Sequence, residues 1–145
     1  MTGRAGMDGI TIEYRVPYAD TDQMGVVYYA NYLALFERAR NELMRATGYS
    51  YRRCEEEGWM LPVIHAEVDY RSPARYDDLL EITARVSELR GVRISIACEV
   101  RRKGEKELLA SGFTRHCFVS GRTFRPVPPP PGFVAEFADA GKGEK

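Results

Sequence analysis

The segment Tyr18–Gly48 reads YADTDQMGVVYYANYLALFERARNELMRATG, an acidic loop that runs into a long helical pattern. From about Val27 onward, apolar residues recur at the i, i+3, i+4 and i+7 spacing that places them on one face of a helix. This stripe comprises Tyr32, Leu35, Phe36, Ala39, Leu43 and Ala46. Gly48 suits the position just after a helix, because glycine readily adopts the left-handed conformation found there. We therefore predict one helix of about five turns that buries a single face.

The chain on either side of this segment is typical of strands. Residues 10–16, ITIEYRV, alternate apolar and polar side chains with the period of two that a half-buried strand shows. Ser50 can cap a short helix over residues 51–57. Further strands are predicted at 59–72, 79–90, 92–102 and 108–119. Because short turns join them, we expect an antiparallel sheet with the long helix on one face, a two-layer α+β fold.

The composition is that of an ordinary globular protein. The 145 residues are 44% hydrophobic and 29% charged, which fits a single domain with a core over about residues 10–132 and flexible termini. The 21 basic and 21 acidic residues leave no formal net charge. That balance argues against a dedicated nucleic-acid binder, which is usually basic.

The cysteine and hydropathy patterns further restrict the class of protein. Cys54, Cys98 and Cys117 are odd in number and far apart, and no Cys/His spacing matches a metal site. We expect reduced thiols, no metal and no cofactor. The sequence has neither a signal-peptide pattern nor an apolar run long enough to span a bilayer, so we expect a cytoplasmic protein without a membrane span.

Asp20 and Asp22 stand just before the predicted helix, where an acidic side chain can have two roles. Capping the helix is the favoured interpretation from the residues alone, and is worth about 1 kcal/mol. Catalysis stays open as the alternative. Gly25 introduces a turn, and the backbone amides that follow it could polarise a bound carbonyl group. A carboxylate a few residues upstream could then attack that carbonyl or activate water.

Other chemistries find little support in the sequence. His65 lies in an apolar strand and His116 alternates with Arg115 and Cys117, so a structural role is favoured for both histidines. No GxSxG elbow, GxGxxG motif or P-loop occurs. A serine hydrolase and the corresponding types of nucleotide-phosphate chemistry are therefore not indicated.

Residues 20–40, DTDQMGVVYYANYLALFERAR, resemble the signature of the hotdog-fold acyl-CoA thioesterases of the 4-hydroxybenzoyl-CoA thioesterase class. They most resemble a branch of small bacterial enzymes often encoded beside the Tol–Pal envelope system. The later pieces VDYRSPARYDDLLEI and LLASGFTRHCFV are also similar, so the resemblance spans about residues 10–132. It implies a hotdog fold, in which a long central helix packs on a curved five-stranded antiparallel sheet, and hydrolysis of acyl-CoA thioesters.

The resemblance also implies roles for individual residues. Asp22 matches the family's catalytic aspartate, which acts as nucleophile or general base on the thioester carbonyl. Tyr29 matches the residue whose backbone N–H polarises that carbonyl, and it stands where many members of the branch have histidine. Gly25 matches a glycine that lets the substrate approach the backbone. Asp20 matches a recurring acid that shapes the loop.

The expected partners are an acyl-CoA substrate and further copies of the chain. Members of the family form homodimers, often homotetramers, with each active site at a subunit interface. Coenzyme A carries phosphate groups that basic residues recognise. Arg90 matches a phosphate contact of the family. Arg93 and Arg125 are further candidates, for which a solvated position at a strand end is an equal alternative.

Alternative functions remain open. A hydratase usually places a histidine in the cleft, and the motif loop and helix contain none. A second type of thioesterase takes its carboxylate from the long helix, where Glu37 and Glu42 are available. A non-catalytic acyl-CoA-binding protein would not need the Asp22 carboxylate. The acyl group is not identified, and five residues line either its pocket or the core: Tyr28, Tyr29, Tyr32, Trp59 and Met60.

Overall fold

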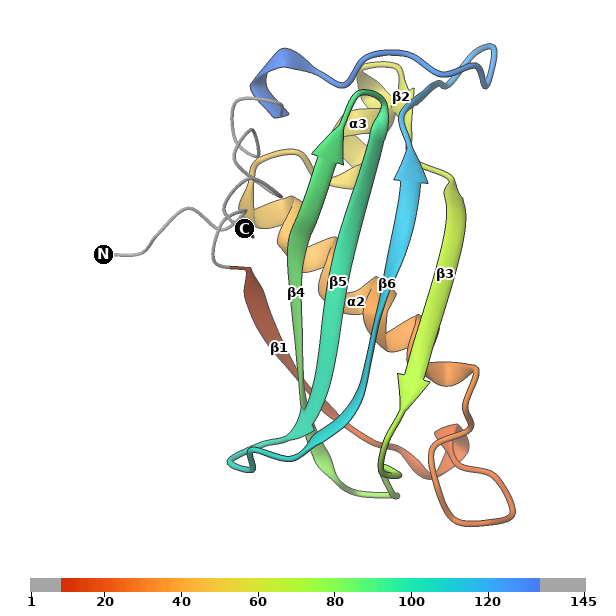
Figure 1. The fold of residues 1–145 in the computed structure, drawn as a ribbon, viewed down its shortest axis with the longest axis vertical. Coiled ribbons are helices and arrows are strands. Elements are labelled where there is room, and N and C mark those ends of the chain that lie inside the picture. Colours follow the sequence, from red (N-terminus) through yellow and green to blue (C-terminus); the bar gives the residue numbers. More distant parts are fainter. Residues whose placement is uncertain (1–8, 134–145) are drawn as a thin grey trace.

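The computed structural model describes residues 9–133, and Figure 1 shows their course. The segments 1–8 and 134–145, which include the termini that we expected to be flexible, lie outside the described residues. The elements in chain order are β1 (Ile10–Arg15), η1 (Tyr18–Asp20), α2 (Asn31–Ala46), α3 (Tyr51–Glu56), β2 (Trp59–Met60), β3 (Val63–Tyr70), β4 (Leu79–Arg90), β5 (Arg93–Arg102), β6 (Leu108–Cys117) and β7 (Val119–Ser120).

The main sheet has five strands in the order β1-β4-β5-β6-β3, and each neighbouring pair is antiparallel. Alternation along the strands places one side of each in the core. In β4, the apolar residues Leu80, Ile82, Ala84 and Val86 are buried, and the residues between them are partly exposed. The strands β1 and β3 form the two edges of this sheet.

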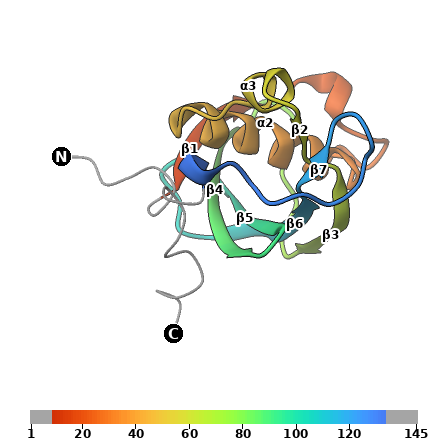
Figure 2. The same cartoon turned by 90° about the horizontal axis from the view of Figure 1, so that it is seen from above.

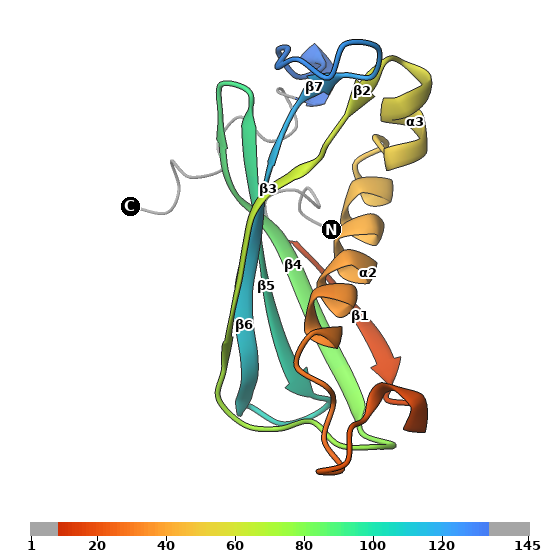
Figure 3. The ribbon, with the colours of Figure 1, turned by 90° about the vertical axis from the view of Figure 1, so that its right-hand side faces the viewer.

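The helix α2 lies along one face of the sheet, as Figures 2 and 3 show. Five members of the predicted stripe are buried there: Tyr32, Leu35, Phe36, Ala39 and Leu43. The sixth, Ala46, is exposed in the last turn. The predicted two-layer α+β fold and the hotdog arrangement are thus confirmed. No helix within residues 9–133 has the length and apolar character that crossing a bilayer requires.

The predicted start of the long helix near Val27 was wrong, because α2 begins at Asn31. The reason is tertiary: Val26 and Val27 are extended, and they bridge to Arg75 and Thr21 respectively. Residues that pair with another backbone segment cannot also enter a helix. The first helical turn therefore forms four residues later than the hydrophobic pattern indicates.

The end of α2 is as predicted. Gly48 has a φ of +85°, in the left-handed region that favours glycine. Its amide donates to the Arg45 carbonyl, and the Tyr49 amide donates to the Met44 carbonyl, which is the Schellman pattern. The short helix α3 is also confirmed, and the Ser50 side chain caps it by accepting from the Arg53 amide.

Two of the predicted strands are divided in the structure. The segment 59–72 forms β2 and β3, with Pro62 in the break between them. The segment 108–119 forms β6 and the start of β7. The strands β2 and β7 pair in a separate two-stranded sheet at the end where α3 lies.

Close contact between helix and sheet depends on Gly112 in β6, which pairs with Val68 of β3. A Cβ atom at position 112 would lie 2.1 Å from the Glu67 carbonyl oxygen and 3.0 Å from Cε2 of Phe36. The Phe36 ring is fully buried. Glycine is therefore required where the central ring of α2 meets the sheet.

We predict that Gly112→Ala lowers the free energy of unfolding by at least about 2 kcal/mol, because the added methyl group overlaps backbone that cannot move freely. Urea unfolding followed by circular dichroism measures the change. Gly121→Ala is the matched control, since a Cβ there meets nothing closer than 3.6 Å. Equal stability of the two variants would contradict the proposed packing constraint.

Candidate active site

Asp22 lies in a tight hairpin loop that precedes α2. Thr21 and Val27 form an isolated antiparallel bridge at its base. Within the loop, the Asp22 amide donates to the Val26 carbonyl at 3.0 Å, and the Gly25 amide donates to the Asp22 carbonyl at 2.9 Å. Gly25 has a φ of +79°, and a Cβ there would meet nothing within 4 Å. Backbone conformation, rather than crowding within the chain, therefore favours glycine at this turn.

The Asp22 carboxylate does not cap α2. Its Oδ1 accepts from the Met24 amide at 2.9 Å, and no donor among residues 9–133 contacts Oδ2. The N-cap of α2 is Ala30, which has no capping side chain. The capping interpretation of the two acids is therefore wrong, and Asp22 retains one carboxylate oxygen for another partner.

Tyr29 lies on the other arm of the same hairpin, two residues before α2. The amides of Tyr29 and Ala30 donate to no acceptor within residues 9–133, whereas the next amide, that of Asn31, donates to the Tyr28 carbonyl. The Tyr70 hydroxyl donates to the Tyr29 carbonyl at 2.9 Å and so holds this turn. The backbone just before α2 thus has two unpaired N–H donors. They follow the arm of the hairpin that pairs with the arm carrying Asp22.

Asp20 is occupied by contacts that shape the loop. Its Oδ2 accepts from the Tyr14 hydroxyl at 2.6 Å, and its carbonyl accepts from the Tyr28 amide and from Nδ2 of Asn31. Burial, followed by the bond to this carboxylate, raises the pKa of Tyr14. These contacts support the structural role that the resemblance implies for Asp20.

A second loop, residues 72–78, supports the hairpin from the side. The Val27 amide donates to the Ala74 carbonyl at 2.8 Å, and the Ala74 amide donates to the Tyr32 hydroxyl. Ala74 and Tyr32 are both buried. The hairpin, the first turn of α2 and the 72–78 loop are therefore joined through one buried contact.

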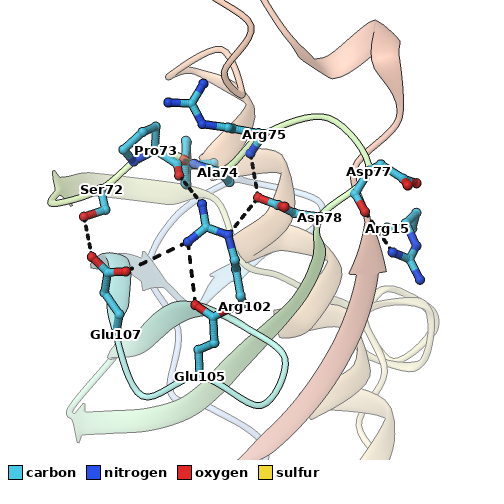
Figure 4. A network of polar contacts seen from close by, with 11 residues as sticks. Arg15, Ser72, Pro73, Ala74, Arg75, Asp77, Asp78, Arg102, Glu105 and Glu107 are labelled. Atoms are coloured by element: carbon cyan, nitrogen blue, oxygen red, sulfur yellow. Dashed lines mark hydrogen bonds and ion pairs between the residues drawn. The ribbon is translucent and has the colours of Figure 1, made fainter.

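Arg102 in turn holds the 72–78 loop, as Figure 4 shows. Its Nε contacts Oδ2 of Asp78 at 3.0 Å, and its Nη2 donates to the Pro73 carbonyl at 2.7 Å. Glu105 and Glu107 lie 3.9 Å from its Nη1. We did not predict a role for Arg102, because in the sequence it is simply one charged residue before a hairpin turn.

The surroundings of Asp22 are aromatic and open to solvent. The rings of Tyr28 and Tyr29 are 4.7 Å apart, and Tyr70 meets both Tyr29 and Tyr32 edge to face. The pKa of Tyr28 is raised, chiefly by a hydrogen bond with Tyr29 and to a smaller extent by the charge of Asp22. Of the five residues considered for an acyl pocket, Tyr28 and Tyr29 thus lie near Asp22, and Tyr32 belongs to the core.

The remaining candidates lie toward the other end of the molecule. Trp59 and Met60 form β2 beside α3. Arg90 and Arg93 bound the β4–β5 hairpin, and Arg90 pairs with Glu88 at 3.3 Å. In Figures 1 and 3 this hairpin and the chain after β7, which carries Arg125, lie at the α3 end, opposite the Asp22 loop. One copy of the chain therefore does not bring the candidate phosphate-binding arginines next to Asp22.

Comparisons with known proteins are consistent with the predicted family. Residues 16–137 match the family model described as the thioesterase-like superfamily. Over 123 residues the chain is 36% identical to the acyl-CoA thioester hydrolase YbgC of Escherichia coli, covering 85% of this chain and 91% of that protein. The family resemblance is therefore confirmed.

Solved structures give the same answer for the fold. A hypothetical protein from Thermus thermophilus superposes with a TM-score of 0.82 at 33% identity, covering 90% of this chain and 98% of that one. A 1,4-dihydroxy-2-naphthoyl-CoA thioesterase from Synechocystis superposes with a TM-score of 0.82 at 25% identity, covering 90% and 96%. These matches span nearly the whole of each chain.

The two histidines lie away from Asp22. His65 is exposed, pairs with Glu67 and stacks on Phe113. His116 is 1% exposed, and its Nδ1 contacts the Leu61 carbonyl while its Nε2 contacts Oγ1 of Thr114. Since a carbonyl can only accept, Nδ1 carries the proton, and Nε2 accepts from the threonine hydroxyl. Burial lowers the pKa of His116 from 6.5 to about 4.

We predict that stability falls as the pH drops from 6.5 to 4, because the unfolded chain then binds a proton at His116 that the folded protein excludes. The loss amounts to at most about 3 kcal/mol from this residue. Urea unfolding across this pH range measures it. His116→Gln should flatten the slope whatever its effect on stability at neutral pH, and His65→Gln should not. The same slope in both variants would assign it to other groups.

Proposed function

The chain belongs to the thioesterase-like superfamily, and from that premise we propose that it hydrolyses acyl-CoA thioesters with the Asp22 carboxylate as nucleophile or general base. One observation carries the proposal. A carboxylate with an uncommitted oxygen and two unpaired backbone N–H groups lie on the two arms of one hairpin. Thioester cleavage needs both, a group that delivers an oxygen and donors that stabilise the developing oxyanion.

In the proposed reaction, the thioester carbonyl oxygen accepts from the Tyr29 amide. Asp22 then either attacks the carbonyl carbon, forming an anhydride that water hydrolyses, or removes a proton from the attacking water. In both routes the C–S bond breaks and the thiolate of coenzyme A leaves and takes up a proton. The balance is one thioester and one water consumed, with one carboxylate, one thiol and one proton formed. The positive φ at position 25 favours glycine, which leaves the turn beside this carbonyl without a side chain.

The alternative carboxylates fit this role less well. Glu42 forms an ion pair with Arg45 at 2.6 Å. Glu37 lies in the second turn of α2 and lines a cavity together with residues of α3. A purely binding protein is the other alternative, and it would have no use for the free oxygen of Asp22.

We also propose that the active protein is a homodimer or a homotetramer. The edge strand β3 exposes apolar side chains, with Val63 and Ile64 50% and 49% exposed, and an unpaired edge of this kind readily pairs with another strand. Antiparallel pairing of two β3 strands would bring the Arg90 end of one copy to the Asp22 end of the other. Arg90, with Arg93 and Arg125 as further candidates, would then bind the phosphates of coenzyme A across the interface.

We predict that Asp22→Asn lowers kcat by about 1,000-fold while thermal unfolding is unchanged, because the amide is isosteric but neither attacks nor accepts a proton. The assay is coenzyme A release from short aliphatic, long aliphatic and aromatic acyl-CoA substrates. Asp20→Asn should lose less than about tenfold, since an amide oxygen still accepts from Tyr14.

The same assay distinguishes the proposed function from its alternatives. Wild-type turnover by Asp22→Asn would remove Asp22 from catalysis. Loss of turnover in Glu37→Gln or Glu42→Gln would favour a glutamate of α2. If the wild-type protein cleaved no member of the panel, the binding function would become the better explanation.

We predict that Ile64→Lys weakens self-association at least about tenfold, because a lysine on the strand edge opposes pairing. Size-exclusion chromatography with light scattering measures the mass. Thr11→Lys places the same charge on an exposed position of the opposite edge strand, β1, and should leave the mass unchanged. A monomeric wild-type protein, or equal dissociation of both variants, would contradict pairing through β3.

A further inference from the structure

A cavity of about 930 Å³ lies at the end of α2 remote from Asp22, where α3 and the β2–β3 connection meet the helix. We call it the α3 cavity. Its walls include Glu37, Arg40, Asn41, Tyr51 and Leu61. Figure 3 shows the two ends of α2, with the loop that carries Asp22 at one and α3 at the other. The cavity is therefore separate from the proposed thioester site of the same chain.

Arg40 is the buried cation of this cavity. It is 8% exposed, its Nε donates to the Tyr51 hydroxyl at 2.7 Å, and its Nη1 donates to Oγ1 of Thr114 at 3.2 Å. No carboxylate within residues 9–133 lies within 4.0 Å of its guanidinium nitrogens. A buried charge is costly unless an opposite charge compensates it. Its remaining N–H groups are thus donors without an anionic acceptor.

The carboxylates around the cavity either pair with other arginines or are exposed to solvent. Three other arginines of its wall each have a glutamate of their own, in the pairs Arg45–Glu42, Arg52–Glu56 and Arg53–Glu57. Glu37, one turn before Arg40 on α2, is exposed and forms no ion pair with it. Arg40 is therefore the arginine of this wall whose charge no described carboxylate balances.

The neighbours of Arg40 cannot supply the missing negative charge. Thr114 accepts from Arg40 and donates a hydrogen bond to the unprotonated Nε2 of His116, which is therefore neutral. Tyr51 accepts from Arg40, and burial raises its pKa to about 12, so it keeps its proton. That hydroxyl proton has no acceptor among the described residues and remains available as a donor.

Asn41 lines the same wall, but its amide oxygen does not open onto the cavity. Its Oδ1 is buried and has no hydrogen-bond partner among the described residues. The α3 cavity therefore presents two donors without an anionic acceptor, the Arg40 guanidinium and the Tyr51 hydroxyl. A buried guanidinium is usually balanced by a negative charge, which indicates that an anionic ligand completes this set.

We propose that the α3 cavity binds a small carboxylate. Arg40 and Tyr51 donate to the carboxylate oxygens, as guanidinium and hydroxyl groups commonly do. The carboxylate belongs either to a free acid or to the far end of an acyl group that a second copy holds at its own thioester site in the proposed dimer, and both sources have the same chemistry at Arg40.

Isothermal titration calorimetry on the full chain tests the proposal with butyrate and butyramide. We expect butyrate to bind at least about tenfold more tightly than butyramide, because the amide carries no charge for Arg40. Failure of both to bind, or equal binding of the acid and the amide, would overturn the proposal.

Three variants assign the binding to individual groups. Arg40→Met keeps the length of the side chain and removes the charge, and should abolish carboxylate binding. Asn41→Asp adds a negative charge to the wall and should weaken it at least about tenfold. Arg52→Met is the matched control, because Arg52 lines the same cavity but is exposed and paired with Glu56. An equal loss in Arg40→Met and Arg52→Met would overturn the assignment to Arg40.

Tyr51→Phe covers the case in which Arg40→Met fails to fold, as judged by circular dichroism. It removes the donor hydroxyl, leaves the arginine in place and should weaken butyrate binding about fivefold to tenfold. Unchanged affinity in Tyr51→Phe would contradict the proposed geometry.

A kinetic comparison separates the two sources of the carboxylate. If the carboxylate ends an acyl chain, glutaryl-CoA should be cleaved with a higher kcat/KM than pentanoyl-CoA, and Arg40→Met should lose that preference. If the ligand is a free acid, the two substrates should be alike and calorimetric binding should remain. This comparison rests on the proposed thioesterase activity, whereas the calorimetry does not. A protein that binds the acid but cleaves no thioester would leave the cavity proposal standing and remove the proposed reaction.

Discussion

The packing of one apolar stripe of α2 against the five-stranded sheet is the constraint on which the rest of the structure depends. Phe36 and its neighbours on this stripe are fully buried, and the contact is so close that β6 has glycine at position 112. A helix held in this way is a rigid rod of about 24 Å. Its two ends therefore become fixed, separate places: the Asp22 hairpin at the start, and the α3 cavity near the end.

At the start of the rod, the extended pairing of Val26 and Val27 delays the helix until Asn31. This delay leaves the amides of Tyr29 and Ala30 unpaired at a helix entrance without a capping side chain. The 72–78 loop is hydrogen-bonded to the hairpin, and Arg102 is in turn hydrogen-bonded to that loop. The loop that carries Asp22 is thus supported over several contacts, which suits a site that must hold a carbonyl group in one position.

The two ends of α2 differ in their electrostatics. The Asp22 end carries carboxylates and tyrosines, whereas the Arg40 end carries a buried cation without an acidic partner among the described residues. The exposed edge strand β3 connects these ends along one side of the sheet. An antiparallel pair of copies would set the unlike ends side by side, so the proposed oligomer and the proposed binding of coenzyme A across it depend on the same geometry.

Local pattern determined the elements of this protein: the period of the stripe predicted α2, Gly48 predicted its end, and alternation predicted the strands of the main sheet. The acidic motif pointed to Asp22, although local rules favoured a cap.

Tertiary structure decided what those rules could not. Backbone pairing with Arg75 and Thr21 moved the helix start, removed the capping role and left the amides free. Arg40 is likewise an ordinary charged residue in the sequence and becomes a buried, uncompensated cation only when α2, α3 and β6 meet. The physical reason is that a hydrogen-bond or charge partner is chosen by proximity in space, which spacing along the chain does not specify.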